Sequence, residues 1–396
     1  MTKTGRKIKL TQYHFLTRVD LPLADCYINR SLCTSGEVKP SLDEKTKASL
    51  VSKPFSRGYM TDKIKVGIVG VGHLGNHHTR ILSQIREAEL VGVNDIDIEK
   101  GRRIAQEYGT RSFETLDQLL EETDALSLVV PTTAHHPLAK KILESGKDLL
   151  IEKPITETVE QAEELVHLAQ KKGAILQVGH IERFNPALRA IEKREADPRF
   201  IESHRMAQFD PRGTDVAVIL DLMIHDIDLI LSLVKSQLSN IEAVGVPVIA
   251  ESQDICNARL SFENGCVANI TASRISARPL RKMRLFERDS YVSLDFLNKS
   301  VEIYRLVEAG QIPSDEKAEK SVVGRIPVEK AGKTIIYEKP KTVDQDMLTS
   351  ELESFLHSVR TRTSPKVTGE DGKRALEVAL TIRDKAEEHQ KRSAGH

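Results

Sequence analysis

Three ionisable residues are spaced within one apolar segment so that they could perform acid-base chemistry together. Asp221, His225 and Asp228 occur in a run of otherwise mostly aliphatic residues. At about 100° per residue, their positions fall within about 60° of one another, as a polar stripe on a helix expected from Val216 to Val234. A carboxylate four residues before His225 can orient the imidazole and keep it basic, which suits a general base near neutral pH. The alternatives are a structural, hydrogen-bonded histidine and a His/Asp metal site.

A lysine in an earlier segment could stabilise negative charge on a substrate. The triplet Glu152-Lys153-Pro154 follows a strand predicted from Asp148 to Ile151. The carboxyl ends of parallel strands line the ligand crevice of an α/β sheet. An ammonium ion placed there can bind a substrate hydroxyl and stabilise the alkoxide that develops as hydride leaves. For the triplet taken alone, a surface lysine at a strand-to-loop junction is the alternative.

A glycine-rich turn precedes both segments and predicts a dinucleotide site. The run Gly70-Val71-Gly72-His73-Leu74-Gly75 lies between a strand predicted from Ile64 to Val69 and a helix predicted from Leu74 to Ile85. Gly70 would form the tight turn, Gly72 would let the backbone approach the phosphates, and Gly75 would let the helix pack on the strand. The first helical amides, at His73 and Leu74, would face the pyrophosphate.

An acidic residue completes this motif. Asp95 follows a second predicted strand, Leu90 to Asn94, about twenty residues beyond the glycines, as the dinucleotide fingerprint requires. A carboxylate there accepts hydrogen bonds from the ribose hydroxyls and repels a 2′-phosphate, so the motif favours NAD over NADP. The alternative is that Asp95 is a turn residue in Asn94-Asp95.

The elements that would position these residues are of two kinds. Strands and helices alternate to about residue 180, which predicts a parallel Rossmann sheet covered on both faces. The further elements predicted in this half are helices at 98–108, 116–120, 137–143 and 159–170 and strands at 125–130 and 174–178. The capping pattern Thr158-x-x-Gln161 introduces the last of these helices.

Beyond residue 200, short alternating segments predict an α+β domain with an open, mostly antiparallel sheet. Its strands are expected at 259–262, 267–271, 283–286, 291–296 and 301–306. The turn Glu263-Asn264-Gly265 joins the first two as a hairpin. The fold class is therefore α/β with a second α+β domain. We expect the open face of its sheet to pack against a second subunit, as a homodimer or homotetramer.

These patterns divide the chain into four parts. Residues 1–60 are expected to be a disordered extension, or the product of a start assigned upstream of Met60. The NAD-binding Rossmann domain is predicted over 61–181, and the substrate and oligomerisation domain over 182–345. Helices near 347–359 and 373–388, within the last part, 346–396, would pack back on the Rossmann domain.

Composition excludes several classes of partner. Lys plus Arg and Asp plus Glu number 58 each in 396 residues, so no bulk field attracts nucleic acid or an anionic membrane. No apolar run approaches the length of a membrane span, and the first residues lack the apolar core expected of a signal peptide. Cys26, Cys33, Cys256 and Cys266 lack metal-ligand spacing and predict reduced thiols in the cytoplasm, and no metal site is expected.

Taken together, the motifs resemble the glucose-fructose oxidoreductase, inositol dehydrogenase and MocA family. The similarity rests on GVGHLGNHH, the strand-end Asp95, VVPTTAHH, IEKP, GHIERFNP and LDLMIHDIDLI, and it extends from Met60 to the C-terminus. The resemblance implies a Rossmann domain, an open-sheet α/β domain and nicotinamide-dependent oxidation or reduction of a sugar-like alcohol. It also implies positions for the site residues: Lys153, Asp221 and His225 as catalytic residues, and Pro131, Thr132, His135 and Glu152 near the nicotinamide.

The run GHIERFNP is similar to family members that oxidise carbon 3 of UDP-N-acetylglucosamine before amination in lipid A assembly. This similarity implies the same substrate and a downstream aminotransferase, with Arg183, Asn185 and Asp228 at the sugar or diphosphate. Arg183, Arg205 and Arg212 would supply guanidinium groups to phosphates, although Arg183 could equally form an ion pair. Alternative substrates are UDP-N-acetylglucosaminuronic acid, a free sugar or inositol. An alternative of another class is a non-catalytic dinucleotide-binding redox sensor.

Overall fold

A computed structural model of the chain describes residues 63–210, 216–308, 321–328 and 331–394. The predicted extension over residues 1–60, the thiols of Cys26 and Cys33, and Arg212 lie outside the described residues.

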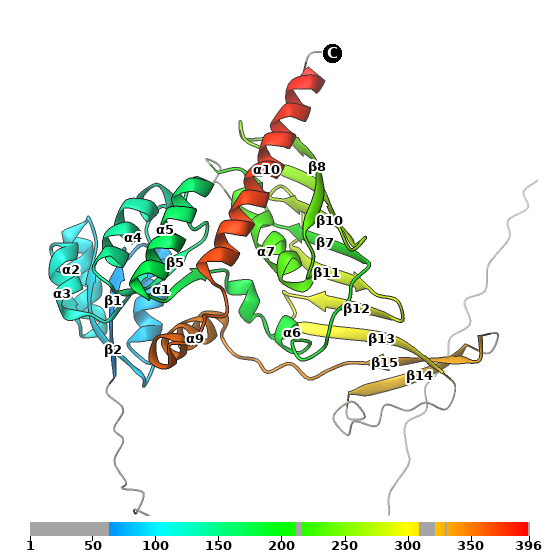
Figure 1. Ribbon diagram of the computed structural model, residues 1–396, viewed down its shortest axis with the longest axis horizontal. Coiled ribbons are helices and arrows are strands. Elements are labelled where there is room, and N and C mark those ends of the chain that lie inside the picture. The colour runs from blue at the N-terminus through cyan, green and yellow to red at the C-terminus, as the bar shows by residue number, and fades with distance from the viewer. Residues whose placement is uncertain (1–62, 211–215, 309–320, 329–330, 395–396) are drawn as a thin grey trace, which may run out of the picture. The chain divides into compact units, whose positions relative to one another are not determined.

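The first sheet has six parallel strands in the order β3-β2-β1-β4-β5-β6 (Figure 1). Its strands are β1 (Ile64–Val69), β2 (Ala88–Asn94), β3 (Arg111–Ser112), β4 (Ala125–Leu128), β5 (Asp148–Glu152) and β6 (Leu176–Gly179). This is the strand order of a dinucleotide-binding fold, in which the chain reverses direction across the sheet between β1 and β4. The crevice at the carboxyl ends of these strands is where a nucleotide is expected.

Helices cover both faces of this sheet. One face packs on α3 (Leu116–Glu122), α4 (His135–Glu144) and α5 (Val159–Lys172). The other packs on α1 (His73–Leu82), α2 (Ile98–Tyr108) and a helix from the far end of the chain, α9 (Met347–Thr361). Leu352 and Phe355 of α9 are completely buried in the same core as Val66 and Ile68 of β1. The last third of the chain therefore supplies part of the Rossmann core.

The second sheet has nine strands in the order β14-β15-β13-β12-β11-β7-β10-β9-β8. These are β7 (Phe200–Met206), β8 (Leu238–Val246), β9 (Ile255–Phe262), β10 (Val267–Ser273), β11 (Leu280–Phe286), β12 (Ser290–Asp295), β13 (Ser300–Glu308), β14 (Val322–Val328) and β15 (Lys333–Glu338). Every pairing is antiparallel except that of β7 with β10. The predicted hairpin forms between β9 and β10, where Gly265 adopts the left-handed φ of +83°. The predicted fold class is confirmed.

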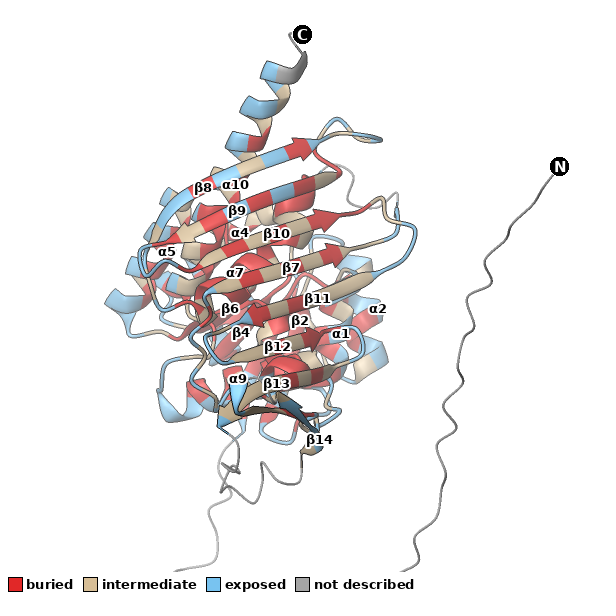
Figure 2. Ribbon diagram, turned by 90° about the vertical axis from the view of Figure 1, so that its right-hand side faces the viewer, coloured by how far each residue is buried: buried red, intermediate tan, exposed pale blue. Residues whose placement is uncertain are grey.

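Helices pack on one face of this sheet, and Figure 2 shows the other face with its alternating buried and partly exposed strand positions. The covering helices are α6 (Pro186–Arg189), α7 (Ile224–Leu233) and α10 (Gly369–Ala394). No helix among the described residues is long and apolar enough to cross a membrane. The same residues contain no group of three His, Cys, Asp or Glu side chains arranged to hold a metal ion.

The helix expected from Val216 to Val234 is not a continuous α-helix. A π-helical turn, η4 (Ile219–Met223), precedes α7 and contains Asp221. A π turn adds a residue and rotates the side chains on its N-terminal side away from their α-helical positions. Accordingly, the Asp221 side chain is 46% exposed whereas that of Asp228 is 1% exposed, so the predicted single stripe is wrong.

Candidate active site

The glycine turn has the geometry that a pyrophosphate needs. Gly70 has a φ of +88°, and a Cβ on Gly75 would lie 2.0 Å from the Gly70 carbonyl oxygen, so the turn and the close helix packing both require glycine. A Cβ on Gly72 would meet nothing closer than the Lys100 Nζ at 3.9 Å, which leaves this backbone open to a ligand. Helix α1 begins here without a side-chain cap or an acidic residue in its first turn. Its amides, including those of the exposed His73 and Leu74, therefore suit an anion.

Asp95 lies at the end of β2 and is tied to this turn. Its Oδ2 accepts a hydrogen bond of 2.7 Å from the Val71 amide, and its Oδ1 accepts one of 2.9 Å from the Asp97 amide. The ammonium group of Lys100 lies 3.7 Å from Oδ2. The carboxylate thus shapes the turn and stands at the position where a dinucleotide places its ribose.

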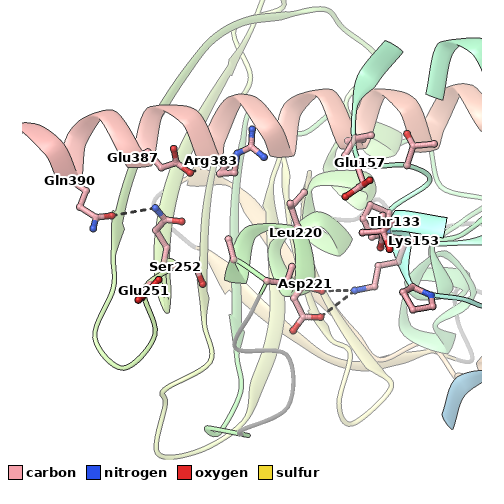
Figure 3. A pocket seen from close by; sticks show the side chains of 18 of the residues that line it. Thr133, Lys153, Glu157, Leu220, Asp221, Glu251, Ser252, Arg383, Glu387 and Gln390 are labelled. Atoms are coloured by element: carbon pink, nitrogen blue, oxygen red, sulfur yellow. Dashed lines mark hydrogen bonds and ion pairs between the residues drawn. The ribbon is translucent and has the colours of Figure 1, made fainter. Parts of the chain in front are cut away.

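Lys153 and Asp221 meet across a cavity between the two sheets. Lys153, just after β5, donates from Nζ to the Asp221 carbonyl oxygen at 2.7 Å, and its Nζ lies 3.4 Å from the Asp221 Oδ1. Both line a pocket of about 990 Å³ together with Pro131 and Thr132. Figure 3 shows Lys153 and Asp221 at one end of it and Gln390 of α10 at the other. The structure thus brings four of the predicted site residues to one pocket.

Two other predicted residues flank Lys153 and make internal contacts. The Glu152 Oε1 lies 3.2 Å from the His78 Nε2, and the Glu152 Oε2 accepts from the Lys153 amide at 3.2 Å. Burial favours the neutral acid, but His78 and Lys153 outweigh it and lower the pKa of Glu152. The ring of His135 lies between the carbonyl oxygens of Pro154, at 2.9 Å, and Val130, at 3.0 Å. Burial lowers the pKa of His135.

The prediction that Asp221 orients His225 is wrong. Asp221 contacts Lys153 instead, because the π turn moves it off the α-helical face. Within the described residues, the His225 Nδ1 is buried without a hydrogen-bond partner. Burial, with the charges of Lys153 and Arg205, lowers the pKa of His225 well below its ordinary value, which corrects the expected basic histidine. The imidazole is therefore neutral at pH 7, the state in which it can accept a proton.

The three residues expected at the substrate are engaged with one another or with the backbone, outside the residues that line the pocket. Arg183 donates to both oxygens of Asp228, at 2.6 and 2.8 Å, so the ion-pair alternative describes it. Asn185 caps α6 by accepting from the Ala187 amide at 3.0 Å, and its amide nitrogen donates to the Phe296 carbonyl oxygen at 3.1 Å. The segment after β6 folds inward here, which sequence spacing could not reveal.

Sequence analysis missed a buried ionic cluster behind His225 and the histidine beside it. Arg205, proposed for phosphate, bonds Asp226 at 2.7 Å and Glu182 at 2.8 Å with all three side chains nearly inaccessible. The ring of His180 lies 6.4 Å from that of His225, and neither of its nitrogens has a partner among the described residues. The signal for His180 was its position directly after β6, at the carboxyl edge of the sheet.

Family models match both halves of this chain. Residues 64–180 match the GFO/IDH/MocA oxidoreductase family model with an NAD-binding Rossmann fold, and residues 189–287 match the C-terminal domain model of the same family. The open Gly72 backbone, the uncapped α1 and Asp95 fit the dinucleotide that the first model implies.

Similar proteins include several dehydrogenases. The UDP-N-acetylglucosamine 3-dehydrogenase of Acidithiobacillus ferrooxidans is 36% identical over 321 residues, 81% of this chain and 96% of that protein. The myo-inositol 2-dehydrogenase of Thermotoga maritima is 22% identical over 343 residues, 82% of this chain and 97% of its own.

Solved structures agree with these similarities. A structure of the A. ferrooxidans enzyme aligns with a TM-score of 0.74 at 36% identity, covering 83% of this chain and 99% of that one. A putative NADPH-dependent oxidoreductase of Desulfitobacterium hafniense shares the fold, with a TM-score of 0.68 at 18% identity, covering 83% and 97%. On the family models and the 36% identical relative, the chain belongs to the GFO/IDH/MocA family of nicotinamide-dependent oxidoreductases.

Proposed function

We propose that this protein is an NAD-dependent dehydrogenase that oxidises the carbon 3 hydroxyl of UDP-N-acetylglucosamine. The observation that carries the proposal is the meeting of Lys153, from the nucleotide-binding half, with Asp221, from the second domain, in one large pocket. The substrate is proposed from the 36% identical relative, whose name states this activity. The product would be a 3-keto nucleotide sugar, and an aminotransferase of lipid A assembly is the proposed consumer.

In this proposal the chain's own side chains handle the proton and the negative charge. Neutral His225 takes the proton from the secondary hydroxyl, and the Lys153 ammonium stabilises the oxygen as its charge develops. Asp221 holds Lys153 at the pocket through the contacts already present in the structure. A bound nicotinamide ring supplies the acceptor for the hydride of carbon 3. The enzyme's contribution is the alignment of these groups in a half-enclosed site.

The cofactor is proposed to be NAD rather than NADP because Asp95 presents a carboxylate at the end of β2. A 2′-phosphate would meet that negative charge. Lys100, 3.7 Å from Asp95, is the cation that could offset it. Separate titrations with NAD and NADP test this choice, since tighter binding of NADP would contradict the role given to Asp95.

The pocket favours a substrate larger than a monosaccharide. At about 990 Å³, it reaches from Lys153 to the C-terminal half of α10, where Arg383 and Lys391 line it (Figure 3). Sites of this size hold drug-sized ligands. Arg183 and Arg205 are held in buried ion pairs, whereas Arg383 pairs with the exposed Asp384, so we propose that Arg383 and Lys391 serve the diphosphate instead.

The test is turnover of a substrate panel by the purified chain. Protein, NAD and a carbonyl trap or aminotransferase are incubated with each nucleotide sugar, inositol and glucose, and reduced cofactor is followed. We expect turnover with UDP-N-acetylglucosamine and its loss in Lys153→Met. Turnover only of UDP-N-acetylglucosaminuronic acid, inositol or a free sugar would overturn the substrate. Tight NAD binding with no turnover of any substrate would favour the non-catalytic redox sensor.

We also propose that the protein is a homodimer or homotetramer assembled through the open face of the nine-stranded sheet. Five aromatic rings, from Phe200, Phe286, Tyr291, Tyr304 and Tyr337, follow one another across this face, with neighbouring centroids 4.7 to 5.7 Å apart. Partly exposed aromatic residues are enriched at subunit interfaces. Sedimentation of the purified chain tests the assembly, and a monomer at micromolar concentration would contradict it.

The cytoplasm is the proposed compartment, because the described cysteines, Cys256 and Cys266, are free thiols. Fractionation of cells that express the tagged chain tests this location, and recovery outside the cytoplasm would contradict it.

A further inference from the structure

A buried chain of polar contacts runs from the sheet to Lys153. The Ser127 Oγ of β4 lies 2.9 Å from the His78 Nδ1, and the other ring nitrogen of His78 lies 3.2 Å from the Glu152 Oε1. Glu152 in turn accepts from the Lys153 amide at 3.2 Å. Ser127 and His78 are each 1% exposed, so water does not compete for these contacts.

We propose that His78 is a positioning residue that holds Lys153 in place and links it to the helix of the glycine turn. His78 lies on α1, whose first residues follow Gly72. The contact between His78 and Glu152 therefore joins the anion-binding end of the Rossmann fold to the strand that carries the lysine. This inference rests on the catalytic role proposed for Lys153.

The hydrogen-bonding capacity of these groups fits both contacts of His78. A carboxylate only accepts, so the ring of His78 donates from Nε2 to Glu152. Its Nδ1 shares the second contact with the Ser127 hydroxyl, which can donate or accept, so one ring position satisfies both contacts. A histidine fixed in this way from both sides orients its partner more strictly than a single contact would.

The backbone beyond Lys153 has an anchor of its own. The ring of His135, 1% exposed, lies 2.9 Å from the carbonyl oxygen of Pro154 and 3.0 Å from that of Val130. The Lys153 amide is therefore linked through the Glu152 side chain to one buried imidazole, and the carbonyl oxygen of the next residue, Pro154, contacts another. Movement of Lys153 would require breaking one of these contacts, so the loss of either should loosen the ammonium group.

Two variants of His78 distinguish a role in positioning Lys153 from a role in stabilising the fold alone. In His78→Gln the amide nitrogen reaches about as far as Nε2 and can still donate to Glu152. In His78→Asn the amide reaches about as far as Nδ1, so the contact with Ser127 can persist while that with Glu152 is lost. The matched control is His136→Asn, which breaks another histidine-glutamate pair, with Glu164 at 2.8 Å, on the exposed surface of α4.

The first measurement uses the chain without substrate. Acetic anhydride labelling followed by mass spectrometry reports the reactivity of Lys153, whose Nζ is bonded to Asp221 in the intact protein. We expect severalfold faster labelling of Lys153 in His78→Asn than in the wild type, with His78→Gln and His136→Asn near the wild type. Equal labelling in all four proteins would overturn the inference even if the proposed activity is present.

The second measurement uses a substrate that the wild type turns over. We expect kcat to fall roughly tenfold to a hundredfold in His78→Asn, with the Kd for NAD nearly unchanged and most of the rate kept by His78→Gln. Equal losses of kcat in both variants would show that His78 stabilises the fold and does not position Lys153. If both variants fail to fold, Ser127→Ala replaces them. We expect a smaller loss of kcat in Ser127→Ala, and an unchanged kcat would count against the inference. Failure of the wild type to oxidise any substrate would instead contradict the proposed function.

The pH profile adds a readout that a general loss of stability would not move. Glu152 faces His78 from α1, His135 from α4, His180 after β6 and Glu351 from α9, besides its neighbour Lys153. His78 and Lys153 hold the pKa of Glu152 down. Removing the donor at His78 raises that pKa, so protonation of Glu152 should add to the acid loss of kcat that His225 sets in the intact enzyme, and the limb should move to higher pH in His78→Asn but not in His78→Gln. An unchanged limb in His78→Asn would count against the inference.

Discussion

The two walls of the pocket differ in how completely their polar groups are already hydrogen-bonded. On the Rossmann side, Lys153 and Glu152 have partners at every group described above. On the side of the second domain, the His225 Nδ1 has none among the described residues, and neither has either ring nitrogen of His180, which follows β6 and faces His225 across the boundary. Both histidines lie behind the residues that line the pocket, and buried polar atoms are normally paired, so atoms left unpaired there need an explanation. The comparison indicates that one wall is preorganised and the other is completed by a ligand.

Replacing the unpaired histidine should have the largest effect. His225→Asn removes the proposed proton acceptor, and we expect kcat to fall by roughly 10²- to 10⁴-fold while the melting temperature stays near that of the wild type. Steady-state kinetics and thermal unfolding of the same preparation check both parts. A fully active His225→Asn variant would contradict the role of His225 as the proton acceptor.

The ionic cluster behind this wall should matter for stability instead. Arg205→Met leaves the buried Asp226 without its cation and Glu182 with only Arg281, at 3.6 Å, and we expect a loss of about 3–5 kcal/mol in the free energy of unfolding. Arg284→Met breaks a half-exposed pair with Glu202 on the open face and should cost about 0–1 kcal/mol. Denaturant titrations measure both, and equal losses would show that burial does not distinguish the pairs.

A smaller and pH-dependent effect is expected at the loop that forms the far edge of the second wall. Asp254 is fully buried, accepts from the amides of Val248, Ile249 and Ala250, and pairs with Arg274. Burial opposes its charge, but these donors lower its pKa to about 2.

A depressed pKa contributes stability that is present above the unfolded value near 4 and is lost as pH falls through the folded value. Asp254→Asn should therefore cost roughly 2 kcal/mol at pH 7, a difference that closes as pH falls from about 4 to about 2. Unfolding titrations of both proteins across this range measure it. A gap that stays constant with pH would show that the charge of Asp254 contributes nothing.

The smallest expected effect is the pH dependence of the intact enzyme. Because burial and Lys153 lower the pKa of His225 well below 6.5, the ring stays neutral through pH 6.5. The acid limb of kcat should lie below that pH, so kcat should change by less than about twofold between pH 7.5 and 6.5. A limb centred near pH 7 would mean that the second wall holds its histidine in a polar, solvated environment.

Sequence alone predicted the Rossmann half well because its signals are local. The helix expected at 98–108 is confirmed with the same bounds, since Asp97 caps it and Gly109 ends it in the left-handed conformation. The strand-end position of Lys153 followed from one apolar run and one topological rule. Both predictions needed only neighbouring residues.

The second wall was harder because its geometry depends on partners far along the chain. The π turn that moves Asp221 off the face of His225 leaves no mark in the hydrophobic period. Likewise, Arg183 and Arg205 look like phosphate ligands until Asp228, Asp226 and Glu182 are known to surround them. Which charges remain available to a ligand is a tertiary property.

The burial of α9 against β1 has a consequence for how the protein is made. A ribosome that has produced every strand of the first sheet has not yet produced Leu352 and Phe355, which fill one of its faces. During translation, the nucleotide-binding half therefore exposes an apolar surface until α9, near the end of the chain, has been synthesised. A fragment that ends before α9 would leave this face of the sheet exposed, so the nucleotide-binding half depends on residues made at the end of synthesis.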